Sequence, residues 1–525
     1  MTLYQPTYPG ADVDFAATLQ GIIDGATFGD TIHFRNAANG GGDVWTLVSP
    51  TSGGAPLTPI AAVEITVSGL TFLFDDDAYL LAAEDSFHPV YCSMLQATNQ
   101  TDLSFIFGNA ASGIRMRRAD YLGPFDQPGD TNINGYVVSE FRHCLALTEC
   151  DDTYIQKGGF RLSGGDGLYL GGKLDSGTSA LKTPCRRTTV VDSLFDENMR
   201  QGVSCTSVDG LYMLRCGFNG SSGRAPQSGI DFEPYHPMAS LKDIMLVDCY
   251  GNDDASRIYF INTGGMIATA GSYPRASHPI DITIKQSISS HTSMNTRGLD
   301  CNCNEGSPPS GTVRLVGWRV TDVPRAGILC NWHVDCGFQL IFDDCVIDSV
   351  ATLMDFPIWI ALYGEGTGSE TGGIYFNRQR VIDTEDRKIV DLDHDATSGT
   401  TTSSGSSTTL VDTARTEAND YWNGKSVTIL SGACAGETRT VLDFDSATDT
   451  VTVSSAFSAT IASGVSYKIG SRSAEGPANC LHGEIFLTPD GYTPAVVQYD
   501  SNTPNLHYGP YVEGAVDVNR LLSLT

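Results

Sequence analysis

The sequence predicts an all-β fold: a right-handed parallel β-helix with an N-terminal capping helix and a small β-barrel or sandwich module near the C-terminal end. Three observations predict it. A five-residue strand pattern repeats, an apolar strand follows most of the repeats, and long amphipathic helices between strands are missing. The chain has 525 residues, with Gly at 56 positions. Abundant turn residues suit many short strands.

The first part of the chain predicts one short helix and then a strand. Apolar residues between Phe15 and Ile23 suit one amphipathic helix, and residues 29–34 begin the first strand. A helix at this place would cover the open end of a solenoid, where strand edges are otherwise unpaired.

The repeated pattern occupies the middle of the chain. In each window the second and fourth positions are apolar, whereas the third and fifth vary and carry most polar groups. This period of two predicts a strand with one buried face. The windows are residues 167–171, 202–206, 229–233, 257–261, 298–302 and 327–331. Neither hairpin turns nor crossover helices occur at regular places between them, which favours stacked parallel coils.

Four stretches resemble the pectate-lyase-like superfamily of β-helical polysaccharide-active enzymes and phage tailspikes. They are the opening residues 10–34 and the blocks 163–171, 198–204 and 225–234, within a likeness that spans residues 5–385. The resemblance implies a polysaccharide or oligosaccharide partner, a monomer or homotrimer, and a location outside the cell or on a phage virion. It leaves the reaction open, because this fold hosts hydrolases, lyases, epimerases and adhesins.

The sequence predicts three segments. Residues 1–395 form the β-helix, 396–471 the small module, and 472–525 strands that pack back on the solenoid. Residues 397–407 are typical of a flexible linker. The module resembles small β modules of phage structural proteins and suits a structural or a carbohydrate-binding role. Tyr421 and Trp422 suit a sugar platform or, more commonly, a small core.

Charge and cysteine content exclude several classes of function. The 32 basic and 61 acidic residues give a formal net charge of −29, which argues against binding nucleic acid or an anionic membrane. No apolar run is long enough to span a bilayer, and no secretory signal precedes the fold. The 14 cysteines mostly fall singly in apolar runs, which predicts buried free thiols. No metal or cofactor is predicted for hydrolysis.

The outward positions of the windows predict the site. Equivalent positions in successive coils lie about 4.8 Å apart, so Asp231, Glu233 and Asp300 share one outer face and are the predicted catalytic carboxyls. Glycoside hydrolysis needs two carboxyl groups, and crowding keeps one of them protonated. The predicted substrate-binding residues are Tyr169, Tyr259, Arg257, Asp166, Arg200, Gln201, His236 and Tyr235. Asp196 and Glu197 are reserve candidates.

A glycoside hydrolase is the favoured function, and two alternatives stay open. A polysaccharide lyase or epimerase on uronic-acid polymers needs a cationic base, with Ca²⁺ or further cations to neutralise the uronate, whereas the outward positions carry acids and tyrosines. A non-catalytic glycan-binding tailspike or virion protein agrees with the missing signal and the phage-like module.

Overall fold

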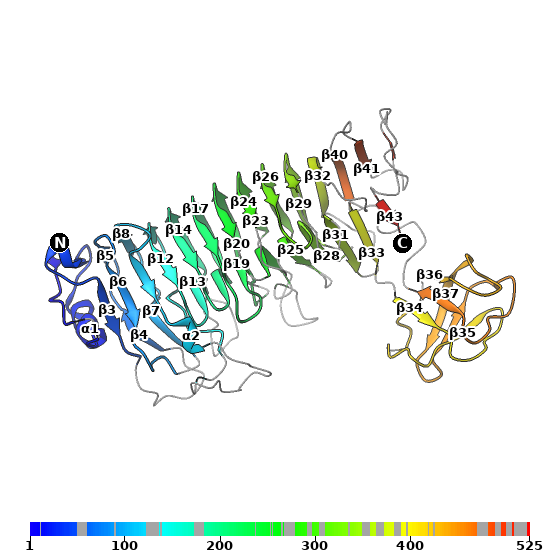
Figure 1. The fold of residues 1–525 in the computed structure, drawn as a ribbon, viewed down its shortest axis with the longest axis horizontal. Coiled ribbons are helices and arrows are strands. Elements are labelled where there is room, and N and C mark those ends of the chain that lie inside the picture. Colours follow the sequence, from blue (N-terminus) through cyan, green and yellow to red (C-terminus); the bar gives the residue numbers. More distant parts are fainter. Residues whose placement is uncertain are drawn as a thin grey trace.

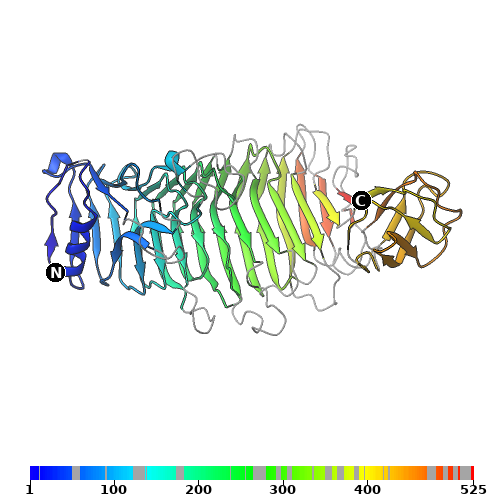
Figure 2. The same cartoon turned by 90° about the horizontal axis from the view of Figure 1, so that it is seen from below.

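A computed structural model of the chain forms a long parallel β-helix with a small antiparallel β unit near its C-terminal end (Figures 1 and 2). The structure describes residues 1–10, 12–49, 60–88, 91–121, 136, 139–172, 183–236, 238–252, 254, 256–263, 266, 279–290, 297–303, 310–333, 336–348, 357–363, 372–382, 390–394, 397–417, 419–423, 426–469, 481–488, 495–499, 507–508 and 522–524.

One face of the solenoid is a sheet with a single strand from each coil. Its strands pair in parallel in the order of the chain. They are β4 (Ile60–Ile65), β7 (Cys92–Thr98), β10 (Leu145–Thr148), β13 (Asp166–Gly171), β16 (Gln201–Cys205), β19 (Ser228–Phe232), β22 (Arg257–Asn262), β25 (Arg297–Cys303), β28 (Ile328–His333), β31 (Ile358–Tyr363), β33 (Val390–His394) and β43 (Leu522–Leu524). We call this the narrow sheet. It contains all six predicted windows and confirms the predicted parallel β-helix.

The rest of each coil belongs to a larger bent sheet with two arms. The first arm is β1 (Leu3–Tyr4), β2 (Thr31–Phe34), β5 (Thr71–Phe74), β8 (Ser104–Phe107), β11 (Tyr154–Gln156), β14 (Cys185–Val191), β17 (Val208–Leu214), β20 (Leu241–Val247), β23 (Ile280–Lys285), β26 (Gly311–Val316), β29 (Phe338–Asp343), β32 (Gly373–Ile382) and β40 (Leu481–Thr488). The second arm is β3 (Val44–Leu47), β6 (Tyr79–Ala82), β9 (Gly113–Arg115), β12 (Gly159–Arg161), β15 (Leu194–Asp196), β18 (Gly217–Asn219), β21 (Tyr250–Asn252), β24 (Ile288–Ser290), β27 (Arg319–Thr321) and β30 (Val346–Asp348).

Residues in the left-handed backbone conformation make the bend between the two arms. Asp192, Arg215, Asp248 and Gln286 hold this place in four successive coils, with φ between 51° and 54°. The N–H of Arg215 still donates to Val247 O of the next coil at 2.9 Å. The chain therefore turns at each corner without breaking the hydrogen bonds between coils.

Helix α1 (Ala16–Gly25) covers the N-terminal end, as the apolar pattern predicts. Phe15, Leu19 and Ile23 are buried in the core beneath it. The Gln20 side chain bonds both the N–H and the C=O of Glu64 in β4, at 2.8 and 2.9 Å. The helix thus supplies hydrogen bonds to part of the otherwise unpaired edge of β4, the first strand of the narrow sheet. Two short helical turns, η1 (Ala37–Asn39) and α2 (Arg118–Tyr121), lie in loops. No helix in the described part of the chain is long and apolar enough to cross a bilayer.

The core is built from columns of equivalent side chains. Phe34 stacks on Phe74 with ring centroids 4.4 Å apart, and Phe74 stacks on Phe107 at 4.6 Å. Paired strands in register place like residues above one another, so flat rings form ladders along the axis. Every cysteine that the structure describes is a buried free thiol, as its place in the apolar runs predicts.

A separate antiparallel sheet follows β33. It contains β34 (Thr397–Thr400), β35 (Thr409–Val411), β36 (Ser426–Ile429), β37 (Thr438–Asp445), β38 (Thr450–Val453) and β39 (Ser466–Ile469). This unit has a hydrophobic core of its own, in which Trp422 is buried, whereas Tyr421 is exposed. The chain then returns to the solenoid through β40, which pairs with β32, and continues into the short strands β41 (Ala495–Tyr499) and β42 (His507–Tyr508).

The interpretation of residues 397–407 as a flexible linker is wrong. β34 pairs with β39 and is the first strand of the unit. Ser403 bridges to Val411, and the Ser406 N–H donates to Thr409 O at 3.1 Å. A run of Ser and Thr is as compatible with an edge strand as with a coil, and the pairing with β39 decides between them.

Replacement of Phe195 tests whether the stacked aromatic rings stabilise the core. Its ring lies between Phe160 and Phe218, at 5.2 and 5.7 Å. Phe195→Ala should lower the free energy of unfolding by about 3–5 kcal/mol, because it leaves a cavity in the core. Phe28→Ala, at a largely exposed ring, is the control and should have little effect. Denaturant titration of both variants measures the difference, and equal stability of the two would contradict the ladder.

Deletion of the small antiparallel unit tests whether the solenoid folds without it. Thr397 and Ile469, at its two ends, are partners in the β34–β39 pair, so a short Gly-Ser linker should replace residues 397–469 without strain. The shortened chain should keep a cooperative thermal transition close to that of the whole solenoid, measured by calorimetry. Loss of that transition would show that the solenoid depends on the unit.

Candidate active site

Two columns of side chains face outward from the middle of the narrow sheet. Strand register places Tyr169, Ser204, Asp231, Phe260 and Asp300 in one column. Glu233 and Asn262 follow in the neighbouring positions two residues further along their strands. The strands therefore bring two of the three predicted catalytic carboxyls, those of Asp231 and Glu233, to one place.

Arg200 lies at the centre of this cluster of side chains, and a hydrogen-bonded turn positions it. Asn198 in the turn before β16 accepts from Ser163 N at 3.1 Å and donates to Phe160 O at 3.1 Å. The Arg200 N–H then donates to Gly165 O at 3.0 Å. Gly165 also allows close approach, since a Cβ there would lie 2.6 Å from Glu140 O. The turn, the glycine and the Glu140 loop therefore meet around one guanidinium group.

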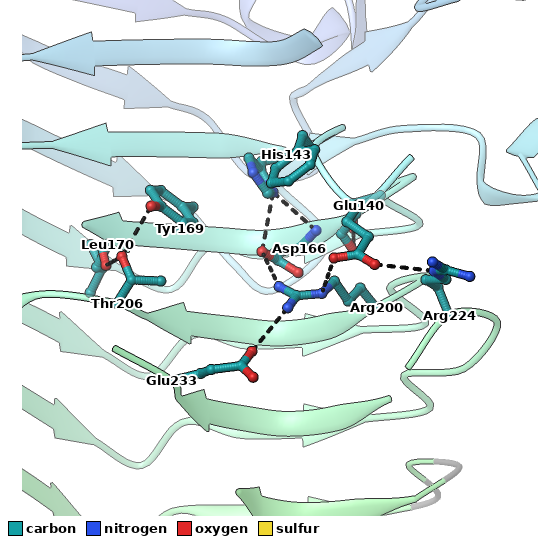
Figure 3. A network of polar contacts seen from close by, with 12 residues as sticks. Glu140, His143, Asp166, Tyr169, Leu170, Arg200, Thr206, Arg224 and Glu233 are labelled. Carbon is teal, nitrogen blue, oxygen red and sulfur yellow. Dashed lines mark hydrogen bonds and ion pairs between the residues drawn. The ribbon is translucent and has the colours of Figure 1, made fainter. Parts of the chain in front are cut away.

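Three carboxyl groups surround that guanidinium (Figure 3). Nη2 of Arg200 lies 3.1 Å from Glu233 Oε2, Nη1 lies 3.5 Å from Asp166 Oδ2, and Nε lies 3.5 Å from Glu140 Oε2. Arg224 Nε meets the other Glu140 oxygen at 3.2 Å. These charges raise the pKa of Arg200 although burial opposes the shift. Asp231 is a fourth acid whose charge acts on Arg200. Two guanidinium groups cannot neutralise four acids, so protonation of some of the acids relieves the repulsion.

Asp166 and His143 form the buried side of the group. Burial, with the charges of Glu140 and Glu233, raises the pKa of Asp166 to about 7 despite Arg200. Burial and the charge of Arg200 lower the pKa of His143 to about 3, so this imidazole is neutral. Its Nδ1 accepts from Asp166 N–H at 3.2 Å and lies 3.3 Å from Asp166 Oδ2. That second contact is favourable only when the carboxyl carries a proton.

Asp231 and Glu233 have contrasting environments. Asp231 is fully buried, and burial, the Glu233 charge and a hydrogen bond with the Glu233 carboxyl raise its pKa well above the ordinary value. The Gln201 amide donates to Asp231 Oδ2 at 2.9 Å and accepts from Ser204 Oγ and Arg200 Nη1, both at 2.9 Å. Glu233 is 34% exposed and accepts from Arg200 and, at 3.0 Å, from Asn262 Nδ2. Each of its two carboxyl oxygens therefore accepts a hydrogen bond from a different side chain.

Tyrosines border the group toward the other ends of the strands. Tyr169 stacks on His143 with ring centroids 5.1 Å apart, and its hydroxyl lies 3.0 Å from Thr206 Oγ1. The Tyr235 hydroxyl donates to Gly172 O at 2.6 Å, and its ring is exposed. Both predicted tyrosines therefore lie beside the acids, with partly accessible rings.

Tyr259 does not face outward, and its predicted role in binding substrate is wrong. It pairs with the inward residues Ile230 and Leu299 and is buried against Trp318. Phe260 takes the outward place, in register with Asp231 and Asp300. The window 257–261 reads equally well in two registers, because Ile258, Tyr259, Phe260 and Ile261 are all apolar or aromatic.

The structure separates Asp300 from the acid pair. Phe260 stands between them in the column, and Asp300 Oδ2 instead lies 3.0 Å from Arg257 Nη1 and 3.5 Å from Arg297 Nη1. His236 is buried in its turn, where Nδ1 accepts from Met238 N at 3.1 Å. Of the two reserve acids, Asp196 lies in the second arm, with Oδ2 3.6 Å from Arg161, and Glu197 directly follows that strand.

Sequence reasoning missed Glu140, His143, Arg224 and Asn262. The first two precede β10, outside the repeated windows, and Arg224 lies in a loop. Only folding brings Glu140 to Arg200, His143 to Asp166 and Arg224 to Glu140. Asn262 directly follows the last residue of its window, so reading the pattern one residue further along would have found it.

A hollow of about 760 Å³ lies elsewhere, beyond the C-terminal ends of β7 and β10. Glu149, Arg186, Asp209, Met238 and Lys242 line part of it. It mixes both signs of charge and contains none of the residues around Arg200, so we place the candidate chemistry at the Arg200 group.

No protein-family model and no curated protein matches the chain. Solved structures with a similar fold include ORF18 of Geobacillus virus E2, with 11% identity, TM-score 0.40, and coverage of 97% of this chain and 86% of the other. The tailspike of E. coli bacteriophage HK620, solved with a pentasaccharide, has 12% identity, TM-score 0.37 and coverage of 89% and 91%. A polygalacturonase from Erwinia carotovora has 12% identity, TM-score 0.32 and coverage of 75% and 91%.

The pKa of Asp166 predicts a pH effect on stability. The folded carboxyl holds its proton up to about pH 7, whereas the unfolded one loses it near pH 4. Ionisation of Asp166 therefore destabilises the fold increasingly between about pH 4 and pH 7. Asp166→Asn removes this loss, so the Tm of the variant minus that of the wild type should rise over this range and then level off.

Scanning calorimetry from pH 4 to pH 8 measures that difference. His143, Arg200, Glu140 and Glu233 face Asp166 and remain in both proteins, so the subtraction removes most of their own titration. A difference that stays constant with pH would mean that Asp166 ionises as readily in the folded chain as in the unfolded one.

Proposed function

We propose that the chain is a glycoside hydrolase that cleaves a polysaccharide on the outer face of the narrow sheet. One observation carries the proposal: two carboxyl groups in contact have opposite environments. Asp231 is fully buried with a raised pKa, and Glu233 is partly exposed and bound by a guanidinium and an amide. Hydrolysis of a glycosidic bond needs one protonated and one ionised carboxyl.

Asp231 acts as the general acid in this proposal. Its Oδ2 accepts from Gln201, whereas its buried Oδ1 accepts no hydrogen bond from a side chain or backbone group in the described part of the chain. The proton of Asp231 passes to the glycosidic oxygen as the bond from that oxygen to the anomeric carbon breaks. The Asp231 carboxylate that remains is stabilised by the charge of Arg200.

Glu233 supplies the second carboxyl. It either takes a proton from a water that attacks the anomeric carbon, or attacks that carbon itself before water releases the sugar. Both routes consume one water and return one proton to the carboxyl pair, so the enzyme is regenerated. Arg200 holds Glu233 in place, and Glu140 and Asp166 hold Arg200. These two acids are positioning residues.

The surroundings agree with a sugar chain as substrate. Tyr169 and Tyr235 offer partly accessible rings beside the acids, and aromatic rings stack on pyranose faces. The carboxyl pair needs no metal or cofactor for this reaction. A polysaccharide substrate suits a protein that works outside the cell or on a virion.

Replacement of the two carboxyls tests the proposal. Asp231→Asn and Glu233→Gln keep the shape and remove the titrating group, so each should lower kcat by at least about 100-fold. The assay measures reducing ends and ultraviolet absorbance on a panel of neutral and acidic polysaccharides. Reducing ends without absorbance are expected. An unsaturated, absorbing product would indicate elimination, and binding without any cleavage would indicate a glycan-binding spike.

Glu64→Gln is the matched control. Glu64 is exposed in β4, in the same outward column of the same sheet, but far from Arg200 in the strand order. It should keep full activity. Near-normal turnover of both site variants, with unchanged melting, would place the chemistry elsewhere.

A further inference from the structure

The hollow of about 760 Å³ beyond the C-terminal ends of β7 and β10 has no part in the proposed chemistry. Its volume is in the range of sites that hold organic ligands, roughly 300–1,000 Å³. Glu149, which lines it, directly follows β10, and its backbone N–H donates to Gly171 O at 2.9 Å. The register of β10 with β13 therefore places Glu149 on the order of 20 Å along the strands from Asp166, at about 3.3 Å per residue.

Glu149 brings an acceptor without a partner to the hollow. The residue is only 9% exposed, and neither of its carboxyl oxygens accepts a hydrogen bond from the described residues. Oε1 is enclosed by protein atoms, so Oε2 is the oxygen that a ligand in the hollow can meet. A largely buried carboxylate normally has donors around it. The hollow is the place from which such donors can come.

Arg186 brings donors to the hollow from the first arm of the larger sheet. It is the second residue of β14 and is in register with Asp209 of β17. Its Nη1 lies 4.0 Å from Asp151 Oδ2, an oxygen that Arg187 approaches to 3.3 Å. Such a distance is too long for a hydrogen bond, and the side chain is 35% exposed. The guanidinium therefore keeps its N–H donors for a ligand.

The loop before β20 adds an apolar wall and a link to the acids. Its exposed Met238 lines the hollow, and the Met238 N–H donates to His236 Nδ1 at 3.1 Å, which fixes the turn. Tyr235 lies in the same loop. Burial raises the pKa of the Tyr235 hydroxyl, and a hydrogen bond with Tyr169 and the charge of Glu149 act on the same group. Tyr235 therefore connects the hollow with Tyr169, which lies beside the acids around Arg200 (Figure 3).

The balance of charges selects the chemistry of the ligand. The described residues that line the hollow include two acids and two bases. An anion would be repelled by Glu149, and a cation by Arg186. A hydroxyl both donates and accepts, so neighbouring hydroxyls of one sugar ring can donate to Glu149 and accept from Arg186. The apolar face of the same ring can then pack on Met238.

We infer that the hollow is a binding site for uncharged sugar residues, remote from the place of cleavage. The inference rests on the proposed function in that both sites bind one polysaccharide chain. That chain passes from the Arg200 group over Tyr169 and Tyr235 to Glu149, and so runs along the strands and across the axis of the solenoid. The part of the substrate in the hollow is neutral.

Equilibrium binding tests the hollow separately from catalysis. The probes are dextran, pullulan, galactan and mannan, with polygalacturonate as the acidic comparison, on full-length chain carrying Glu233→Gln to prevent cleavage. At least one neutral polymer should bind. Adding Glu149→Gln or Arg186→Gln should each raise its Kd at least about tenfold, since a hydrogen bond to a charged group has this strength.

Matched controls and a stability measurement separate binding from folding. Glu64→Gln, at an exposed acid of the same sheet, and Arg215→Gln, at an exposed arginine bound to Asp192, should bind like the parent. Glu149→Gln should not lower the Tm, because the carboxylate has no hydrogen bond to lose in the free chain. If Glu149→Gln does not fold, Arg186→Gln still decides the matter.

Kinetics with Glu233 restored give a second readout. On a polymer that the chain cleaves, Glu149→Gln should raise KM and leave kcat nearly unchanged, because the hollow binds substrate and transition state equally.

Three outcomes would overturn the site: no binding of any neutral polymer, unchanged Kd in both Glu149→Gln and Arg186→Gln, or tighter binding of polygalacturonate than of every neutral polymer. Cleavage that Asp231→Asn abolishes, with no dependence on Glu149 or Arg186, would remove the site and keep the hydrolase. Binding that depends on Glu149, without cleavage of any polymer, would do the reverse.

Discussion

The alignment of each strand with the same strand of the next coil is the constraint on which the rest of this molecule depends. Parallel pairing fixes one register for every coil, and a shift by one residue would exchange the inner and outer faces. Inside, the register stacks like rings, as in the Phe34, Phe74 and Phe107 ladder. At the corners, left-handed residues such as Asp192 and Arg215 keep the ladder unbroken while the chain turns. Stability and the positions of surface groups therefore come from one source.

The same register crowds charged groups on the outer face. Strands about 4.8 Å apart bring acids from separate coils together, and the repulsion between them must be relieved by cations or by protons. Arg200 relieves part of it, by contact with Glu140, Asp166 and Glu233. Burial of Asp166 and Asp231 raises their pKa, so protons relieve the rest. The stacking of the strands therefore favours the protonated form of these two buried acids.

The outer face changes its chemistry within a few coils. Around β16 and β19 it presents carboxyl groups beside one arginine, and at β22 and β25 it presents Arg257 and Arg297 around Asp300. Phe260 separates the two parts and supports Arg257.

The amino-acid sequence alone determined the parallel β-helix, the N-terminal helix and the outward position of Asp231 and Glu233, because alternation with a period of two defines buried and exposed faces. It did not determine the register at residues 257–261, where four apolar or aromatic side chains in a row fit both faces, so Tyr259 was exchanged with Phe260. Nor did it reveal Glu140 and His143. They lie outside the repeats, and only the folded chain brings Glu140 to Arg200 and His143 to Asp166. Local pattern decides which face a strand buries. Which charges meet, and so which acids keep a proton, is decided by contacts between distant segments that exist only in the folded chain.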